Sequence, residues 1–404
     1  MVDTSDFILR EGYLNAIETF IDKPVVKVLK GMRRVGKSVL IKLLINRLIK
    51  KGVPSLNNIL YINKESLEFD EIKNHNDLYQ YTRDYFKDVK GSRYIFIDEI
   101  QEIDGWEKAV ASFLADNLGD VVISGSNARL LSSELATLLG GRYVEIPVYP
   151  LTFSEFLMFR KDKTDIETEF KNYLRYGGLP GIHQLPLNDE AIFSYLNSIL
   201  NTVLYKDVIT RYKIRDASIF DKVVRYLFDN TGNITTAKKI ADYFKSQRVR
   251  VSVDTILNYI GYIESSLLVD RVPRYDIKGK KLIEFFDKVF LNDIGLRNGF
   301  IGYRERDITG IIENIVYKEL QARGYKVSIG TIGQIEIDFI AEKQNNKKYI
   351  QVCYTLGSEA AIEREFGNLK KIRDNYEKIV ISMDRFFPSE RDGIAHQYLI
   401  DFLL

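Results

Sequence analysis

A glycine-rich octet near the N-terminus has the residue types and spacing that bind phosphate. It reads Gly31-Met32-Arg33-Arg34-Val35-Gly36-Lys37-Ser38, the pattern G-x-x-x-x-G-K-[ST]. Glycines let the backbone curl so that its N–H groups point at an anion, and a helix that begins there adds partial positive charge. Lys37 would reach the β- and γ-phosphates, and the Ser38 hydroxyl would ligate Mg²⁺. The octet therefore predicts a site for ATP and Mg²⁺, with six binding residues: Gly31, Arg34, Val35, Gly36, Lys37 and Ser38.

The segments around the octet are those that such a loop needs. The apolar run Val25–Leu29 enters it as a buried strand would. After it, apolar residues recur at helical spacing, namely Val39, Leu40, Leu43, Leu44 and Leu48. This order predicts a strand, a phosphate-binding loop and a helix.

A second apolar strand ends in two carboxylates. The run Tyr94–Ile97 is followed by Asp98 and Glu99. Asp98 would hold Mg²⁺ beside Ser38, and Glu99 would act as the general base that polarises the attacking water. The pair therefore predicts a hydrolytic site.

Two further polar positions are candidates for catalysis. Asn127 or Ser126, after the strand Val121–Ile123, would lie between the water and the γ-phosphate; the alternative is an ordinary turn and helix cap. Arg142 would neutralise charge on the transferred phosphoryl group, from a neighbouring subunit of a homo-oligomer; the alternative is a surface arginine with a structural partner.

These motifs together resemble the predicted ATPases of bacteria and archaea in the AAA superfamily, in the archaeal-ATPase-like branch. Further segments carry the resemblance: Asp98–Gln101 with Trp106-Glu107, Gly125–Asn127, Gly141-Arg142, Pro150–Phe156, Tyr176–Pro180 and Leu204–Val208. It extends to the C-terminus. The resemblance implies an α/β fold with an ASCE-type parallel sheet flanked by helices. It also implies a winged-helix module and a C-terminal α/β domain like that of restriction endonucleases.

The middle of the chain has the pattern of that module. Ala237–Phe244 is a short amphipathic helix, and Val253–Ile263 places apolar residues on one face of another. An extended stretch, a turn at Ile277–Lys281 and a returning strand follow. Two helices and a hairpin predict a winged helix.

Basic residues gather in this module, with ten basic and five acidic residues from Lys238 to Lys281. The candidates for phosphate contact precede the second helix or lie at the hairpin turn: Lys245, Arg248, Arg250, Lys278, Lys280 and Lys281. They favour DNA as a partner. Docking of a protein, or a purely structural role, is the alternative.

The C-terminal segments have the order helix, strand, strand with Asp, and return strand, as in the endonuclease-like fold. The resemblance places acids of a metal-dependent nuclease at Glu313 and Asp338, and its Glu-x-Lys pair at Gln351 and Cys353. Gln351 is a poor Mg²⁺ ligand, and Cys353 cannot supply the charge of a lysine. Nuclease activity would need Glu336 as a substitute ligand for the metal ion. The sequence therefore predicts a degenerate nuclease fold that binds DNA or a protein; Asp338 in a simple cap or ion pair is the alternative.

Composition limits the remaining possibilities. The chain has 404 residues, 45% of them apolar and 28% charged, with a formal net charge of +2. One cysteine excludes an internal disulfide, and the absence of a long apolar run argues against a membrane span and for a cytoplasmic protein. We expect four domains: an ATPase core at 1–160, a helical extension at 161–230, the winged-helix-like module at 231–300 and the nuclease-like domain at 301–404.

The function that these patterns favour is an ATP-hydrolysing switch or motor whose C-terminal modules bind DNA. An ATP-gated DNA nuclease and an ATP-regulated protein adaptor are the alternatives. The physiological partner does not follow from these residues.

Overall fold

The computed structural model describes residues 7–52, 55–128 and 137–404, and the chain divides into two units. The first unit contains Met1–Val148 with Ser265–Leu267, and the second contains Tyr149–Glu264 and Leu268–Leu404. Each has its own sheet.

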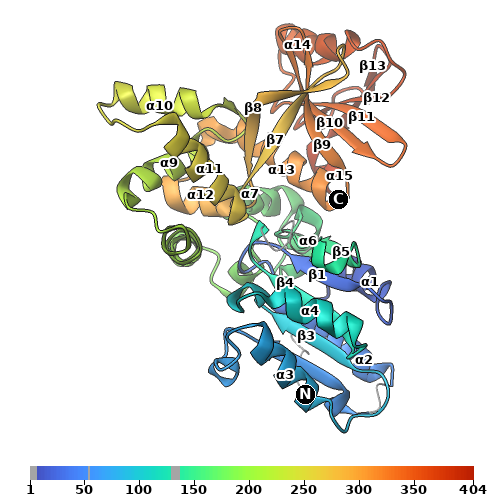
Figure 1. The fold of residues 1–404 in the computed structure, drawn as a ribbon. Coiled ribbons are helices and arrows are strands. Elements are labelled where there is room, and N and C mark those ends of the chain that lie inside the picture. Colours follow the sequence, from blue (N-terminus) through green and yellow to red (C-terminus); the bar gives the residue numbers. More distant parts are fainter. Residues whose placement is uncertain (1–6, 53–54, 129–136) are drawn as a thin grey trace. The chain divides into compact units, whose positions relative to one another are not determined.

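The sheet of the first unit is parallel throughout, in the order β2-β3-β4-β1-β5 (Figure 1). The strands are β1 (Val26–Lys30), β2 (Ile59–Asn63), β3 (Tyr94–Asp98), β4 (Asp120–Gly125) and β5 (Tyr143–Pro147). Residues of β1, β3 and β4 are buried almost throughout, as in parallel sheets that are covered on both faces. The predicted α/β class with a parallel sheet is confirmed.

Helices and short turns complete this unit: α1 (Glu11–Glu18), α2 (Lys37–Lys50), η1 (Leu56–Asn58), η2 (Leu67–Phe69), α3 (His75–Tyr85), η3 (Ile100–Glu102) and α4 (Trp106–Ala115). Leu78 of α3 and Phe113 of α4 lie in one core cluster with Ile95 and Ile97 of β3. The buried leucines of α2 confirm the predicted helix, and each stabilises the unit by about 1.5–3 kcal/mol.

The second unit begins with helices: α6 (Phe153–Phe159), α7 (Ile166–Tyr176), η5 (Pro180–Gln184), α8 (Asp189–Thr202), η6 (Val203–Thr210), α9 (Ala217–Asp229) and α12 (Ile294–Ile301). Helix α12 packs against α7, α8 and α9. The segment η6 continues α8 as a π-helix. This conformation is rare in proteins, and where it occurs it is often at a functional site.

The predicted helix–helix–hairpin order of the middle segment is present. It consists of α10 (Ala237–Ser246), α11 (Val253–Ser265), β7 (Val269–Asp276) and β8 (Lys281–Leu291), and β6 (Ile234–Thr235) pairs with β8. The hairpin is antiparallel and its turn lies at residues 277–280, as expected.

The hairpin also belongs to a larger sheet, which the sequence did not indicate. The remaining strands are β9 (Lys326–Ile332), β10 (Ile335–Lys343), β11 (Asn346–Val352), β12 (Glu377–Ser382), β13 (Glu390–Arg391) and β14 (Ile394–Tyr398). The sheet runs β13-β14-β12-β11-β10-β9-β7-β8-β6. Strand β7 pairs in parallel with β9, with Arg274 opposite Ile329 and Asp276 opposite Thr331. The hairpin and the C-terminal strands are therefore parts of one sheet.

The remaining elements are η7 (Glu305–Asp307), α13 (Ile308–Ala322), α14 (Glu359–Lys370) and α15 (Leu399–Leu403). Phe366 of α14 lies in a core cluster with Ile337 of β10 and Val380 of β12. The expected C-terminal order of helix, strand, strand with Asp and return strand is present as α13, β9, β10 and β11. Within the described ranges, no helix is long and apolar enough to cross a membrane.

Candidate functional site

The glycine-rich octet forms the turn between β1 and α2. A side chain at Gly31 would place its Cβ 2.2 Å from the carbonyl oxygen of Val148, so only glycine fits there. Gly36 has a φ of +100°, which favours glycine, and it is the N-cap residue of α2. Arg34 also has a positive φ, 67°. The octet thus has the tightly curled backbone that an anion-binding loop requires.

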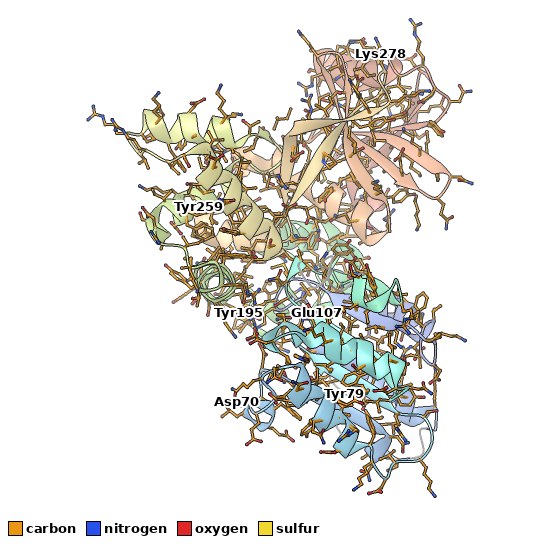
Figure 2. The ribbon with its side chains drawn as sticks, in the orientation of Figure 1. Asp70, Tyr79, Glu107, Tyr195, Tyr259 and Lys278 are labelled. Carbon is orange, nitrogen blue, oxygen red and sulfur yellow. The ribbon has the colours of Figure 1, made fainter. Side chains whose placement is uncertain are left out.

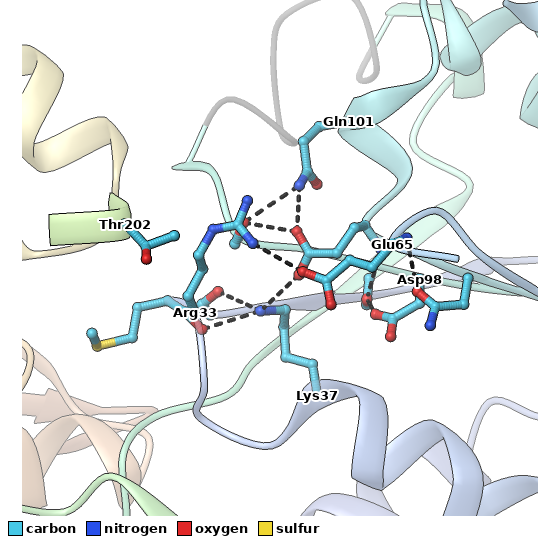
Figure 3. Close-up of polar contacts among 12 residues, drawn as sticks. Arg33, Lys37, Glu65, Asp98, Gln101 and Thr202 are labelled. Carbon is cyan, nitrogen blue, oxygen red and sulfur yellow. Dashed lines mark hydrogen bonds and ion pairs between the residues drawn. The ribbon is translucent and has the colours of Figure 1, made fainter. Parts of the chain in front are cut away.

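Lys37 is folded back over its own loop. Its Nζ donates to the carbonyl oxygens of Gly31 at 3.0 Å and Met32 at 3.1 Å. The same Nζ lies 3.5 Å from Oε1 of Glu99, and the residue is only 4% exposed (Figure 3). The ammonium is therefore already aimed into the loop, where it is held mainly by neutral carbonyl groups.

The parallel sheet brings the other predicted residues to the same edge. Asn63 of β2 lies opposite Asp98 of β3, and Ile97 lies opposite Ile123 of β4. Since β1, β3 and β4 end at one edge, the octet, Asp98-Glu99 and Ser126-Asn127 follow neighbouring strand ends. Asp98 is 1% exposed; it accepts hydrogen bonds from the hydroxyls of Ser124 and, at 3.4 Å, Tyr61.

Glu99 is held in an uncommon conformation by several donors. Its φ of 55° and ψ of 48° lie in the left-handed region, a strain that is frequent at functional sites. Its Oε2 accepts from the Ser126 hydroxyl at 2.8 Å and from the amide of Gln101 (Figure 3). Burial raises the pKa of Glu99, but the Lys37 ammonium and the two hydrogen bonds outweigh it, so the pKa lies below its ordinary value. The carboxylate is therefore ionised at neutral pH and able to accept a proton.

Three contacting residues were not among the predicted site residues: Tyr61, Gln101 and Ser124. Ser124 could have been found, because it lies two residues before Ser126 at the end of a strand that neighbours β3. Tyr61 gives no such signal, since only the pairing of β2 with β3 brings it to Asp98.

Asn127 and Arg142 remain predictions as catalytic residues. Asn127 is buried beside Ser126. Arg142 is exposed just before β5, and its Nε donates to the carbonyl oxygen of Leu139 at 3.2 Å.

The four residues of the expected degenerate nuclease site do lie together. Glu313 of α13, Glu336 and Asp338 of β10, and Gln351 of β11 line one cavity of about 660 Å³. Burial raises the pKa of Cys353, which also lines it, to about 12, so its thiol stays neutral. Sequence reasoning missed Glu365 of α14, which receives a hydrogen bond from Gln351, and Lys288 of β8, which lies among the acids.

The six basic candidates for DNA contact are exposed. Lys245, Arg248 and Arg250 lie at and after the end of α10, whereas Lys278, Lys280 and Lys281 lie at the hairpin turn. Figure 2 shows Lys278 at the end of the hairpin that lies away from α10. The two groups are therefore separate patches.

Among the comparisons with known proteins, the match to a described domain family falls mainly in the first unit. The family model for the AAA domain matches residues 23–157, and a model for a domain of unknown function matches residues 167–307. Among solved structures, a Walker-type ATPase of Pyrococcus abyssi has a TM-score of 0.49 at 15% identity, covering 73% of this chain and 96% of that one. The Aeropyrum pernix ORC1 protein in complex with DNA has a TM-score of 0.33 at 14% identity, covering 72% and 92%. At these values neither structure informs function.

Two sequence relatives cover most of the chain. An uncharacterized protein of Haemophilus influenzae is 38% identical over 401 residues, 98% of each chain. An uncharacterized protein of Methanocaldococcus jannaschii is 30% identical over 366 residues, 86% of this chain and 78% of that one. The protein belongs to the family of these bacterial and archaeal relatives, and the match of its residues 23–157 to the AAA-domain model confirms the predicted resemblance to the AAA superfamily.

Proposed function

We propose that the protein is a Mg²⁺-dependent ATPase that works as a nucleotide-driven switch or motor, with DNA as the partner of its second unit. The observation that carries the ATPase proposal is the convergence of Lys37, Asp98 and Glu99 at one edge of a parallel sheet, beside an anion-binding loop. The AAA-domain match over the same residues supports it.

Each residue has a role that its contacts allow. A phosphate in the loop would replace the carbonyl oxygens of Gly31 and Met32 as the partner of Lys37, because a charged acceptor binds an ammonium more strongly than a neutral one. Ser38 and Asp98 offer the hard oxygen donors that Mg²⁺ prefers. When bound, the ion would neutralise phosphate charge.

Glu99 would take the proton of the attacking water. Its ionised state at neutral pH fits that role, and Ser126 fixes its position. Asn127 would contact the water or the γ-phosphate from the adjacent strand end.

Substitution of the loop lysine tests the proposal. Lys37→Ala should abolish ATP binding, measured with a fluorescent ATP analogue, while Lys50→Ala at the exposed end of the same helix should leave binding unchanged. ATP turnover that survives in Lys37→Ala at the wild-type rate would exclude this site as the catalytic one.

Arg142 is proposed to act across a subunit interface of a homo-oligomer, because its guanidinium is exposed and follows the glycine pair that precedes β5. A mixing experiment tests this role. Arg142→Ala and Lys37→Ala should each be inactive alone, and their mixture should regain turnover, since each supplies what the other lacks. A mixture that stays inactive contradicts action in trans.

DNA binding is proposed for the two basic patches because they are exposed and the segment around them carries excess positive charge. Changing Lys278, Lys280 and Lys281 to Glu should weaken binding to duplex DNA. The slope of the logarithm of the binding constant against the logarithm of salt concentration should become less steep by about 0.9 for each phosphate that is no longer neutralised. The matched control changes three exposed lysines of the helical segment, Lys161, Lys163 and Lys171, to Glu. Equal effects of both triplets, or no DNA binding by the wild type, would favour a protein partner.

A further inference from the structure

Lys288 is a buried lysine beside the acidic cavity of the second unit, in contact with three of the acids that line the cavity. It lies on β8, is 3% exposed, and its Nζ is 2.6 Å from Oε1 of Glu336 and 3.2 Å from Oε2 of Glu313. Oδ1 of Asp338 lies 3.8 Å from the same nitrogen. Three carboxylates from two elements, α13 and β10, therefore converge on one ammonium group.

The resemblance to endonuclease-like domains assigns two of these acids, Glu313 and Asp338, to a divalent cation, and Glu336 is the substitute ligand that such a site would need. The residues present do not fit that ion. Among the residues that the structure describes, no group of three or more His, Cys, Asp or Glu side chains is arranged to hold a metal. The cluster instead surrounds a positive charge that belongs to the protein itself.

Other polar atoms that line the cavity are hydrogen-bonded to the protein itself. Oδ2 of Asp338 accepts from the backbone N–H of Val352 at 2.8 Å, and the side-chain oxygen of Gln351 accepts from the N–H of Asp338 at 2.8 Å. The amide nitrogen of Gln351 donates to Glu365 at 2.8 Å. Gln351 thus joins two acids by hydrogen bonds, a role that the glutamate of a metal site could not fill because it has no donor.

The charges agree with this arrangement. Burial lowers the pKa of Lys288, but Glu313, Asp338 and Glu336 outweigh it and raise the pKa above its ordinary value, so the ammonium stays charged. Removing one partner from a buried ion pair leaves an uncompensated charge, so these groups depend on one another.

We propose that Lys288 takes the place of a divalent cation in this cavity, so that the second unit keeps its acidic cluster together without a metal. Because Lys288 belongs to the hairpin and its partners belong to α13 and β10, the same ammonium also ties the hairpin to the C-terminal part of the sheet. The cavity then lacks the ion that a nuclease mechanism would need.

Binding of Mn²⁺ to the nucleotide-free, full-length protein tests the proposal. The free ion is measured by electron paramagnetic resonance during titration of the wild type, Lys288→Ala and Lys288→Ala with Glu313→Gln. We expect no Mn²⁺ binding at this cavity in the wild type, binding in Lys288→Ala, and its loss in the double variant. Circular dichroism confirms that each variant is folded, and Lys288→Gln replaces Lys288→Ala if the latter is not.

Two results would overturn the proposal. One is Mn²⁺ binding by the wild type that Glu313→Gln alone abolishes, because the cavity would then hold a cation beside Lys288. The other is a folded Lys288→Ala or Lys288→Gln protein that gains no Mn²⁺ binding, because the ammonium would then not be standing where a cation fits. The first result needs no variant at Lys288, so a folding defect cannot hide it.

Discussion

Lys37 of the first unit and Lys288 of the second are both buried and both face carboxylates, but their partners differ in kind. Lys37 is held by two neutral backbone carbonyls and lies 3.5 Å from a single carboxylate, Glu99. Lys288 is surrounded by three carboxylates. A phosphate can displace neutral carbonyls from an ammonium, whereas it would have to displace charged partners at Lys288.

The carboxylates of the two sites differ in the same way. Near Lys37, hydrogen bonds and the ammonium lower the pKa of Glu99 despite its burial. Near Lys288, burial and neighbouring acids raise the pKa of Glu313 and of Asp338 despite the ammonium. One site therefore keeps an ionised base ready for a substrate, whereas at the other site burial favours the protonated form of Glu313 and Asp338. A buried lysine beside acids is not enough for a reactive site, because a substrate must also be able to displace the groups that the lysine contacts.

Glu99→Gln is the change with the largest expected effect. We expect turnover of ATP to fall by about 100- to 10,000-fold, the usual contribution of a general base, while ATP binding through Lys37 persists. Phosphate release and binding of a fluorescent ATP analogue measure the two quantities. Glu102→Gln, at the exposed end of η3, is the control and should turn over ATP normally. Loss of binding in Glu99→Gln would show that Glu99 organises the loop rather than the water.

The contrast between the two sites also marks how far sequence could go. The octet and the pair Asp98-Glu99 each follow an apolar strand directly in the sequence. Residue spacing alone was therefore enough to predict that a strand ending in acids lies beside a glycine loop. Lys288 is different, because it lies 25 residues before Glu313 and 50 before Asp338 and carries no motif. Only the pairing of β7 with β9 brings its hairpin to the acids, and pairing between distant strands leaves no local periodicity. The positive charge among the acids thus comes from a strand that lies far from them in the sequence.

Lys288→Ala should cost about 3–5 kcal/mol of stability in the absence of metal, since it leaves buried carboxylates without their counter-charge. Lys37→Ala should cost less, about 1–2 kcal/mol, because it removes mainly hydrogen bonds to carbonyl groups. Trp106, the single tryptophan, lies in the first unit, so its fluorescence reports Lys37→Ala, and far-ultraviolet circular dichroism also reports the second unit. Equal decreases in the free energy of unfolding of the two variants, measured with urea, would contradict the expected difference between the two lysines.

Ser126→Ala sharpens the comparison at the first site alone. It removes the 2.8 Å hydrogen bond to Glu99 and should raise the pKa of that carboxyl while leaving ATP binding intact. We expect roughly a tenfold fall in turnover, from the loss of a hydrogen bond to a charged group worth about 1.5 kcal/mol. The pH profile separates this from a structural defect, because the acid limb of turnover should move to higher pH. An unchanged limb with lower turnover would mean that Ser126 acts on something other than Glu99.

The smallest expected effect is the pH dependence of the second site. Burial, and then Glu313, raise the pKa of Asp338 well above its ordinary value despite Lys288, so in the window above about pH 4 the folded state binds more protons at this site than the unfolded chain does. The stability of the wild type relative to Asp338→Asn should therefore fall as pH rises through that window, as linkage requires. Asp392→Asn is the matched control with the opposite sign, because hydrogen bonding to Lys370 lowers the pKa of Asp392, so the wild type loses its advantage over that variant as pH falls. Urea unfolding from about pH 3 to 8 distinguishes the two slopes, because the Asp392 contribution is lost only below about pH 5. If both stability differences changed with pH in the same direction, the pKa of Asp338 would be lowered by Lys288, as that of a surface acid is lowered by its ion pair. The contrast with Glu99 would then lose its electrostatic basis.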